Sequence, residues 1–181
     1  TSIGVNTKLL TPAQYPKTWA DLGNPIYKGK ISAGRPDKSG SAYIQLALIL
    51  QIYGEDKGWP IYQRILDNTV LSNSSGAVSK FVNDGEAMVG LSNEDTLLRF
   101  KVGGGPVELL YPADGTSAIA DVMALTASPA NPQGGRAFIN FMLSKEAQEI
   151  LDGAGRRSVR ADVVSKNAPT PLSKIKAVKY E

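Results

Sequence analysis

The chain has 181 residues, of which 42% are hydrophobic and 20% charged, a size and composition typical of one globular domain. It contains no cysteine and no histidine, which excludes disulfides, metal sites built from these residues, and catalytic triads that need either one. The net charge is +3, and no apolar run is long enough for a membrane-spanning helix. We expect no cofactor and no bound metal.

The basic residues are unevenly distributed. Residues 156–181 hold seven of the 20 Lys and Arg residues but only two of the 17 Asp and Glu residues. A nucleic-acid-binding surface interleaves basic with aromatic side chains, whereas this segment has only Tyr180 and also contains Pro169 and Pro171. We therefore expect no nucleic-acid binding, an α/β domain over residues 1–155, and a basic, extended segment over 156–181.

The hydrophobic pattern predicts strands that alternate with helices. In chain order we expect a strand at 3–5, a helical turn at 19–22, a strand at 30–34, helices at 41–53 and 57–66, a strand at 69–71, a helix at 77–82, a strand at 87–91, a helix at 94–101, strands at 107–111 and 122–125, and helices from 132 and at 145–151. This alternation predicts a three-layer αβα sandwich around a mostly parallel, mixed sheet.

Some helices carry more detailed expectations. Residues 41–53 are apolar almost all the way round, which predicts a buried helix. In the next helix, Pro60 would lie in the first turn and Trp59 on the inner side. The helix from 132 begins with Asn131 as N-cap and proline at its first position, and Ser144 would cap the helix after it.

The first candidate site lies between the strand that ends at Gly34 and the long helix. Ser39, Gly40 and Ser41 would place free N–H groups and hydroxyls at the positive end of that helix, which favours an anion. The spacing from Gly34 to Lys38 does not fit the GxxxxGK phosphate loop, so nucleotide hydrolysis is not predicted. A plain N-cap at Ser39 or Ser41 is the alternative.

Two more polar loops follow strands. Asn73, Ser74 and Ser75 offer more hydrogen-bonding groups than one helix cap needs, although a solvated loop explains them equally. Glu94 and Asp95 begin a helix, where carboxylates favour the helix dipole, but they can also accept hydrogen bonds from ligand hydroxyls or amines. As sequence neighbours they point in different directions, which argues against a glycosidase-like pair.

Seven segments together resemble the extracellular solute-binding proteins of the ferric-iron and phosphorylated-sugar group. These segments are PKTWADL (16–22), YKGKI (27–31), KSGSAY (38–43), YGEDKGW (53–59), GEAMVG (85–90), YPADGTS (111–117) and FINFMLSKEAQ (138–148). The resemblance implies the type II periplasmic binding-protein fold, in which two α/β lobes close on a ligand. This chain resembles the second lobe alone, so we expect a fragment or a split protein whose 156–181 segment returns toward the missing first lobe.

The resemblance also implies a function. The chain would be one lobe of the substrate-binding component of an ABC transporter, with a permease as partner of the full-length protein, and not an enzyme. Ser39, Gly40 and Ser41 would hold an anionic group, the loop at 73–75 would add hydrogen bonds, and Glu94 or Asp95 would face ligand hydroxyls. The ligand would be a small anionic solute such as a phosphorylated sugar.

Three alternatives remain open. Ferric iron is a second ligand class, but iron-binding members place two adjacent tyrosines near the position of Glu94 and Asp95. An α/β enzyme acting on a phosphorylated small molecule would need a second titratable group near Glu94. Self-association of the isolated lobe is the third.

We expect a periplasmic or extracellular location, secreted or lipid-anchored. No signal-peptide pattern stands at Thr1, so an export signal would have been cleaved or would lie on a missing part of the chain.

Overall fold

The computed structural model describes residues 1–166 and 170–178. Its contacts divide the chain into two compact units, one formed by residues 1–118 with 170–181 and the other by residues 119–169. This division differs from the expected one at 155/156. The C-terminal segment returns to the first unit because the Thr116 N–H donates to Lys176 O (2.8 Å), the Val178 N–H donates to Thr116 O (2.9 Å), and Ile175 is buried there.

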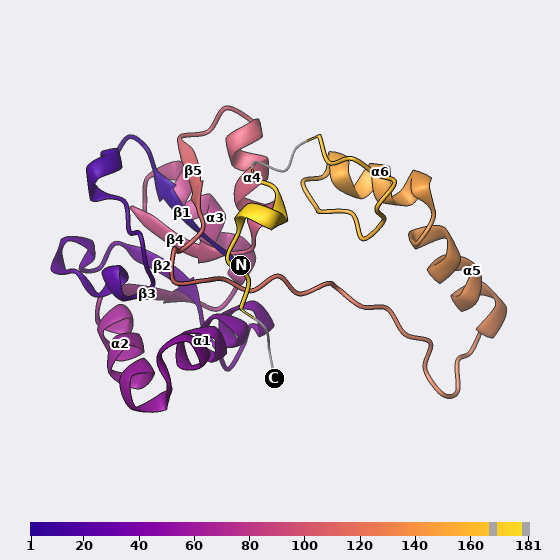
Figure 1. Cartoon of the computed structure of the whole chain (residues 1–181), viewed down its shortest axis with the longest axis horizontal. Helices are drawn as coiled ribbons and strands as arrows, with labels where there is room; N and C mark the ends of the chain where they lie inside the picture. The colour runs from indigo at the N-terminus through magenta and orange to yellow at the C-terminus, as the bar shows by residue number, and fades with distance from the viewer. Residues whose placement is uncertain (167–169, 179–181) are drawn as a thin grey trace. The chain divides into compact units, whose positions relative to one another are not determined.

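A five-stranded sheet forms the centre of the first unit (Figure 1). Its strands are β1 (Ser2–Asn6), β2 (Ile31–Gly34), β3 (Thr69–Ser72), β4 (Val89–Ser92) and β5 (Val107–Leu110), in the order β3-β2-β4-β1-β5. β2 pairs in parallel with β3 and β4, whereas β1 is antiparallel to both β4 and β5. Every strand except β1 therefore runs in one direction, which confirms the expected α/β fold with a mostly parallel, mixed sheet.

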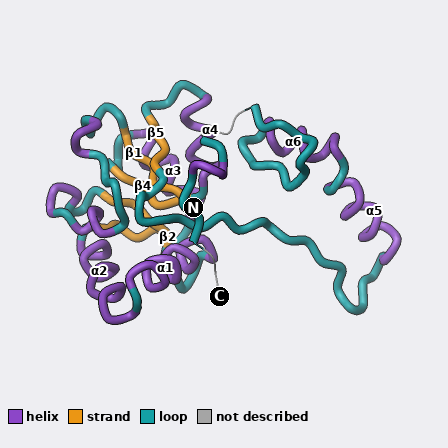
Figure 2. The backbone as a smooth tube through the Cα atoms, viewed as in Figure 1, coloured by secondary structure: helices purple, strands orange, loops and turns teal. Residues whose placement is uncertain are grey.

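Four α-helices cover this sheet: α1 (Gly40–Tyr53), α2 (Glu55–Asp67), α3 (Ser75–Asp84) and α4 (Glu94–Val102). Short 3₁₀ turns connect other parts of the unit at Pro12–Gln14, Ala20–Gly23, Pro25–Tyr27 and Leu172–Lys174. Figure 2 shows the strands of this unit gathered at its centre, with helices around them. The turn expected at 19–22 is thus a 3₁₀ turn displaced by one residue.

The two faces of the sheet are packed differently. One apolar cluster joins β1, β2 and β4 to α1 and α2. On the other face, Gly4 lies directly opposite Gly90 in the β1–β4 ladder. A Cβ at Gly4 would lie 2.3 Å from Leu97 Cδ2 of α4, and one at Gly90 would lie 2.5 Å from Val82 Cγ2 of α3. The glycine pair therefore lets α3 and α4 approach the strands closely, which completes a three-layer sandwich.

The structure corrects two expectations about the helices. α1 is not buried all round, because its buried residues form only one stripe and Tyr43 is 62% exposed. Trp59 of α2 is also not on the inner side: it is half exposed and contacts the Tyr62 ring edge-on, with ring centroids 6.5 Å apart. Each helix buries one stripe fully, while Tyr43 and Trp59 stay at the surface and residues such as Leu46 and Ile52 pack only partly on the apolar cluster.

The loop after β5 is anchored to the helices. The Trp19 indole N–H donates to Gly115 O at 2.8 Å, the Trp19 backbone N–H donates to Asp114 Oδ2 at 3.1 Å, and the Tyr53 hydroxyl donates to the same carboxylate. Burial, together with the hydrogen bond to Asp114 and its negative charge, raises the pKa of Tyr53 to about 12. These bonds fix the chain where it leaves the last strand.

The second unit contains the helices α5 (Pro132–Met142) and α6 (Lys145–Gly153). Both expected caps are confirmed: Asn131 Oδ1 accepts from the Gly134 N–H at 2.8 Å, and Ser144 Oγ accepts from the Ala147 N–H at 3.2 Å. The strand expected at 122–125 is wrong. A strand needs a neighbour, and within residues 1–166 and 170–178 this segment has none.

No helix in the described part of the chain combines the length and the apolar character needed to cross a membrane.

Candidate functional site

The carboxyl ends of β2, β3 and β4 lie at one edge of the sheet. The strands are parallel, and Gly34 of β2 is in register with Ser72 of β3, while Ala33 is in register with Leu91 of β4. Each strand is followed by a helix whose N-terminus therefore lies at this edge: α1 after β2, α3 after β3 and α4 after β4. Backbone N–H groups and the positive ends of the helix dipoles make such an edge suitable for an anion.

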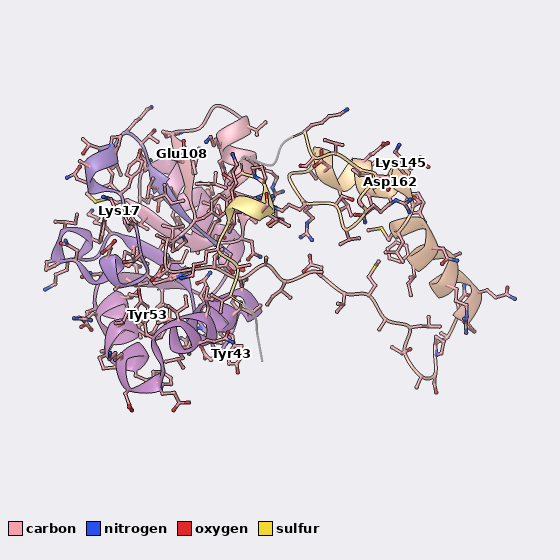
Figure 3. The ribbon with its side chains drawn as sticks, in the orientation of Figure 1. Lys17, Tyr43, Tyr53, Glu108, Lys145 and Asp162 are labelled. Carbon is pink, nitrogen blue, oxygen red and sulfur yellow. The ribbon has the colours of Figure 1, made fainter. Side chains whose placement is uncertain are left out.

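The three residues expected at the start of α1 occupy that helix end. Ser39 is the N-cap, and its Oγ accepts from the Ala42 N–H at 3.4 Å. The Ser39 and Ser41 hydroxyl oxygens are 3.3 Å apart, and a Cβ at Gly40 would meet no atom within 4 Å. The helix start therefore carries a hydroxyl pair, with open space beside Gly40. Figure 3 labels Tyr43 in the first turn of α1.

A charged pair shapes the loop before this helix. The guanidinium of Arg35 donates twice to the Asp37 carboxylate, at 3.0 and 2.9 Å. The hydrogen bond from Arg35 lowers the pKa of Asp37, so this carboxyl stays ionised. The Lys38 and Ser39 N–H groups both donate to Arg35 O, at 3.0 and 2.9 Å. Arg35 thus helps to form the turn that presents Ser39.

The start of α3 is organised by Ser72. Its hydroxyl donates to Ser74 O at 2.9 Å and accepts from the Ser74 N–H at 3.1 Å. Ser74 is the N-cap of α3 but makes no side-chain capping bond. Asn73 and Ser74 are exposed, and Ser75 is half-buried. The polar residues of this loop therefore have two roles. The Ser72 hydroxyl holds the loop in shape through its hydrogen bonds to the Ser74 backbone, and the exposed Asn73 and Ser74 face outward.

The start of α4 places Glu94 and Asp95 in its first turn, both half-buried. Glu94 Oε2 accepts a hydrogen bond from the Tyr111 hydroxyl at 2.7 Å. Tyr111 follows β5, whose carboxyl end lies at the same edge because β1 is antiparallel to both β4 and β5. The carboxylate is thereby oriented by a phenol from a fourth loop.

A chain of hydroxyls supports the start of α4 from behind. Thr96 Oγ1 lies 2.9 Å from Ser79 Oγ and 2.9 Å from Ser92 Oγ, and it donates to Asn93 O at 2.8 Å. Ser79 and Ser92 are buried. These bonds link α3, β4 and the first turn of α4, so side-chain contacts as well as the sheet hold α4 against α3.

Sequence reasoning did not single out Tyr111, Thr96 or Arg35 as members of the site. Tyr111 and Glu94 are 17 residues apart, so no local spacing connects them. A usable signal was available all the same, because Tyr111 is the last residue of the strand predicted at 107–111, and the carboxyl ends of such strands share one edge of an α/β sheet. Among the described residues, no three Asp or Glu side chains cluster closely enough to suggest a metal site.

Comparison with known proteins gives one family for the chain. The family model described as bacterial extracellular solute-binding protein matches residues 1–180. A periplasmic protein of Salmonella typhimurium, provisionally assigned to 2-aminoethylphosphonate binding, is 30% identical over 87% of the chain and 49% of its own length. The spermidine/putrescine-binding periplasmic protein of the same species is 25% identical over 86% of the chain and 46% of its length.

A solved structure agrees with this match. The periplasmic binding protein AfuA from Actinobacillus pleuropneumoniae, with exogenous fructose-6-phosphate bound, is 27% identical and gives a TM-score of 0.82 over 99% of this chain and 58% of AfuA. The chain spans about half the length of the curated relatives it matches. This is a family of binding proteins and not of enzymes. The chain belongs to the bacterial extracellular solute-binding protein family.

Proposed function

We propose that the chain supplies a ligand-contacting edge of the substrate-binding component of an ABC importer, and that its ligand is a small anionic solute such as a phosphorylated sugar. The observation that carries this proposal is the alignment of the N-termini of α1, α3 and α4 at one edge of a parallel set of strands. The working protein would be periplasmic or extracellular and would deliver its ligand to a membrane permease.

In this proposal one group of residues binds the anionic group of the ligand, and a second group accepts hydrogen bonds from the rest of the ligand. Ser39, Gly40 and Ser41 bind the phosphate or similar group through hydroxyls and N–H groups at the start of α1, where the space above Gly40 is open. The exposed loop at 73–75 adds hydrogen bonds. Glu94, oriented by Tyr111, and Asp95 accept hydrogen bonds from hydroxyls on the rest of the ligand.

Two of the compared proteins support a phosphorus-bearing ligand, and the residues of this chain support it over iron. The fructose-6-phosphate in AfuA and the ligand assigned to the Salmonella protein both carry a phosphorus oxyanion. Iron-binding members place two adjacent tyrosines near the positions of Glu94 and Asp95, and this chain has no tyrosine at either position. The helix N-termini also bring N–H donors to the edge, and N–H groups bind oxyanions rather than cations.

Thermal unfolding of the purified chain tests the proposal. Inorganic phosphate, fructose-6-phosphate and ferric citrate are added separately at millimolar concentration, because a ligand that binds only the folded state raises the midpoint. We expect fructose-6-phosphate to raise it most. Ser39→Asp and Ser39→Asn form a matched pair, since Asp and Asn cap helices about as well as Ser. The added charge of Ser39→Asp should abolish the shift, and Ser39→Asn should retain most of it.

Three results would contradict the proposal. The first is a midpoint that rises only with ferric citrate, which would favour the iron alternative. The second is an equal shift with phosphate in Ser39→Asp and Ser39→Asn, because an anion bound at the start of α1 must respond to a negative charge placed there. Absence of any shift at millimolar ligand would exclude a useful anion site on this chain alone.

A further inference from the structure

The strand β3 forms one edge of the sheet in the first unit (Figure 1). Within the described residues it pairs with β2 alone, and two of its four residues are exposed, Val70 at 61% and Leu71 at 46%. Edge strands are usually protected against further pairing by a charged side chain, a proline or a bulge. Residues 68–79, which contain β3, include no charged residue and no proline. β3 is therefore an unprotected edge with an apolar centre.

The opposite edge of the sheet is protected. Among the described strands β5 pairs with β1 alone, and it carries Glu108, whose carboxylate lies 2.5 Å from Lys101 Nζ of α4. A charged pair on an edge strand opposes the approach of another strand, because its charges would lose contact with water. β3 is therefore the edge better suited to pair with a further strand.

The backbone of β3 has hydrogen-bonding groups at this edge. Asn68 O and Ser72 O accept backbone N–H groups from β2 and the residue after it, at 3.2 and 3.0 Å. In a parallel ladder every second residue directs its N–H and C=O to the neighbouring strand. Thr69 and Leu71 therefore direct theirs to the open edge, and within residues 1–166 and 170–178 neither makes a backbone hydrogen bond beyond the β2–β3 ladder.

We propose that β3 pairs in antiparallel orientation with β3 of a second copy of the chain, about a two-fold axis at Val70. In this register Thr69 of each copy lies opposite Leu71 of the other. Their outward N–H and C=O groups form hydrogen-bonded pairs, and each pair exchanges two bonds. Val70 lies opposite Val70 of the second copy in a non-hydrogen-bonded pair, where side chains are closest. The most exposed residue of the strand is thereby covered.

Charge favours a second copy as the occupant of this edge. A two-fold contact places a residue on the axis against its own equivalent, so a charge there would meet a like charge. The uncharged run at 68–79 avoids this repulsion, and the outward backbone groups of β3 match those of an identical strand. Only four residues pair, so the contact is small for a specific interface, and we expect a dissociation constant on the order of 0.1 mM.

The pairing leaves the candidate site open. Because the two copies of β3 run in opposite directions, the carboxyl ends of the two sheets point away from each other, and the two loops at 73–75 lie at opposite ends of the contact. The inference therefore does not depend on the ligand, and failure of either proposal leaves the other standing.

Sedimentation equilibrium of the 181-residue chain tests the inference. We expect a reversible dimer that contains half of the chain near a total concentration of about 0.1 mM. Hydrogen exchange followed by NMR locates the pairing. The amides of Thr69 and Leu71 should exchange about threefold more slowly at about 1 mM than at about 50 µM, because a larger fraction of the chain is paired. The Val70 amide, which faces β2, should not change.

Charge substitutions at the axis test the register. Val70→Lys and Val70→Glu should each abolish the dimer, because like charges would meet at the axis. An equimolar mixture of the two variants should restore it as a heterodimer. Val102→Lys is the matched control: Val102 is 67% exposed at the end of α4, and this variant should keep the dimer. All three positions of substitution are exposed, so each unfolding midpoint should stay within about 3 °C of the wild-type value.

Three outcomes would overturn the inference. A chain that stays monomeric at about 1 mM would show that β3 does not pair with itself. A dimer that survives Val70→Lys would place the contact elsewhere on the chain. Loss of the dimer in both single variants without recovery in their mixture would exclude the two-fold register at Val70.

Discussion

The Tyr53 hydroxyl, at the end of α1, donates a hydrogen bond to the carboxylate of Asp114, 61 residues further along the chain. Asp114 also accepts from the Trp19 backbone N–H at 3.1 Å, and Gly115 O accepts from the Trp19 indole at 2.8 Å. Since Trp19 is fully buried in the main apolar cluster, this set of bonds joins the core to the loop after β5. Tyr111, which orients Glu94, lies at the start of the same loop.

Replacing Tyr53 by phenylalanine should destabilise the first unit by about 1–2 kcal/mol, because a partly buried carboxylate loses one of its hydrogen-bond donors. Urea unfolding at pH 7 measures the loss. Tyr43→Phe is the control: Tyr43 is on the same helix but 62% exposed, and its replacement should change the free energy of unfolding by less than about 0.5 kcal/mol. Equal effects of the two variants would contradict the role given to Asp114.

The raised pKa of Tyr53 predicts that the protein loses stability at alkaline pH. This pKa is raised to about 12 in the folded protein, above the value of about 10 in an unfolded chain. The unfolded state therefore releases this proton first, and the stabilisation from neutral Tyr53, fully present below pH ~10, is lost as the pH rises toward 12.

The free energy of unfolding should therefore fall over this pH interval and fall less steeply in Tyr53→Phe. A residual slope is expected in the variant, because burial also raises the pKa values of Tyr27 and Tyr62. Urea unfolding at several pH values between 9 and 12 compares the two slopes, and identical slopes would show that Tyr53 does not titrate differently on folding.

Gly90→Ala should destabilise the first unit by about 1–3 kcal/mol through overpacking. The new Cβ would lie 2.5 Å from Val82 Cγ2 and 3.0 Å from Val78 Cγ1, and both valines are fully buried. In Gly76→Ala the nearest atom would be Ser74 Oγ at 3.6 Å, so this control should not destabilise the fold. Chemical unfolding of both variants provides the comparison, and a neutral Gly90→Ala would mean that α3 can move away from the sheet.

Glu94→Gln should separate two kinds of ligand. The amide oxygen can still accept the hydrogen bond from Tyr111, but the negative charge is removed. Inorganic phosphate should then bind a few-fold more tightly, because a repulsion on the order of 1 kcal/mol disappears. 2-Aminoethylphosphonate, whose ammonium group can pair with Glu94, should gain less or lose affinity. Calorimetric titration measures both, with Glu86→Gln as an exposed control on the same unit.

The sequence predicted the strands of the first unit because local pattern determines them. The continuous apolar run at 87–91 lies within and just before β4, whose four residues are all buried. The antiparallel direction of β1 could not be predicted in the same way. It is set by pairing with β4 and β5, which are more than 80 residues away, and no spacing within one strand encodes such a contact.

The difference between local pattern and long-range pairing also explains why the strand predicted at 122–125 is absent and why Tyr111 was missed at the candidate site. Val122 to Leu125 has a strand pattern, but a strand exists only where a neighbour accepts its hydrogen bonds, and Val122 is 89% exposed. At the candidate site, the N-cap role of Ser39 could be predicted because N-caps are local. Tyr111 was not found because only the order of strands places it beside Glu94.

The return of the C-terminal segment to the first unit also affects the order of events during synthesis. Thr116 exchanges backbone hydrogen bonds with Lys176 and Val178, and Ile175 is buried in the same unit. A ribosome makes residues 1–118 first, then the whole of 119–169, and only afterwards the residues that complete the first unit. All five strands can pair before that moment, but the loop that carries Tyr111 and Asp114 receives its last contacts only after residues 170–178 have been made.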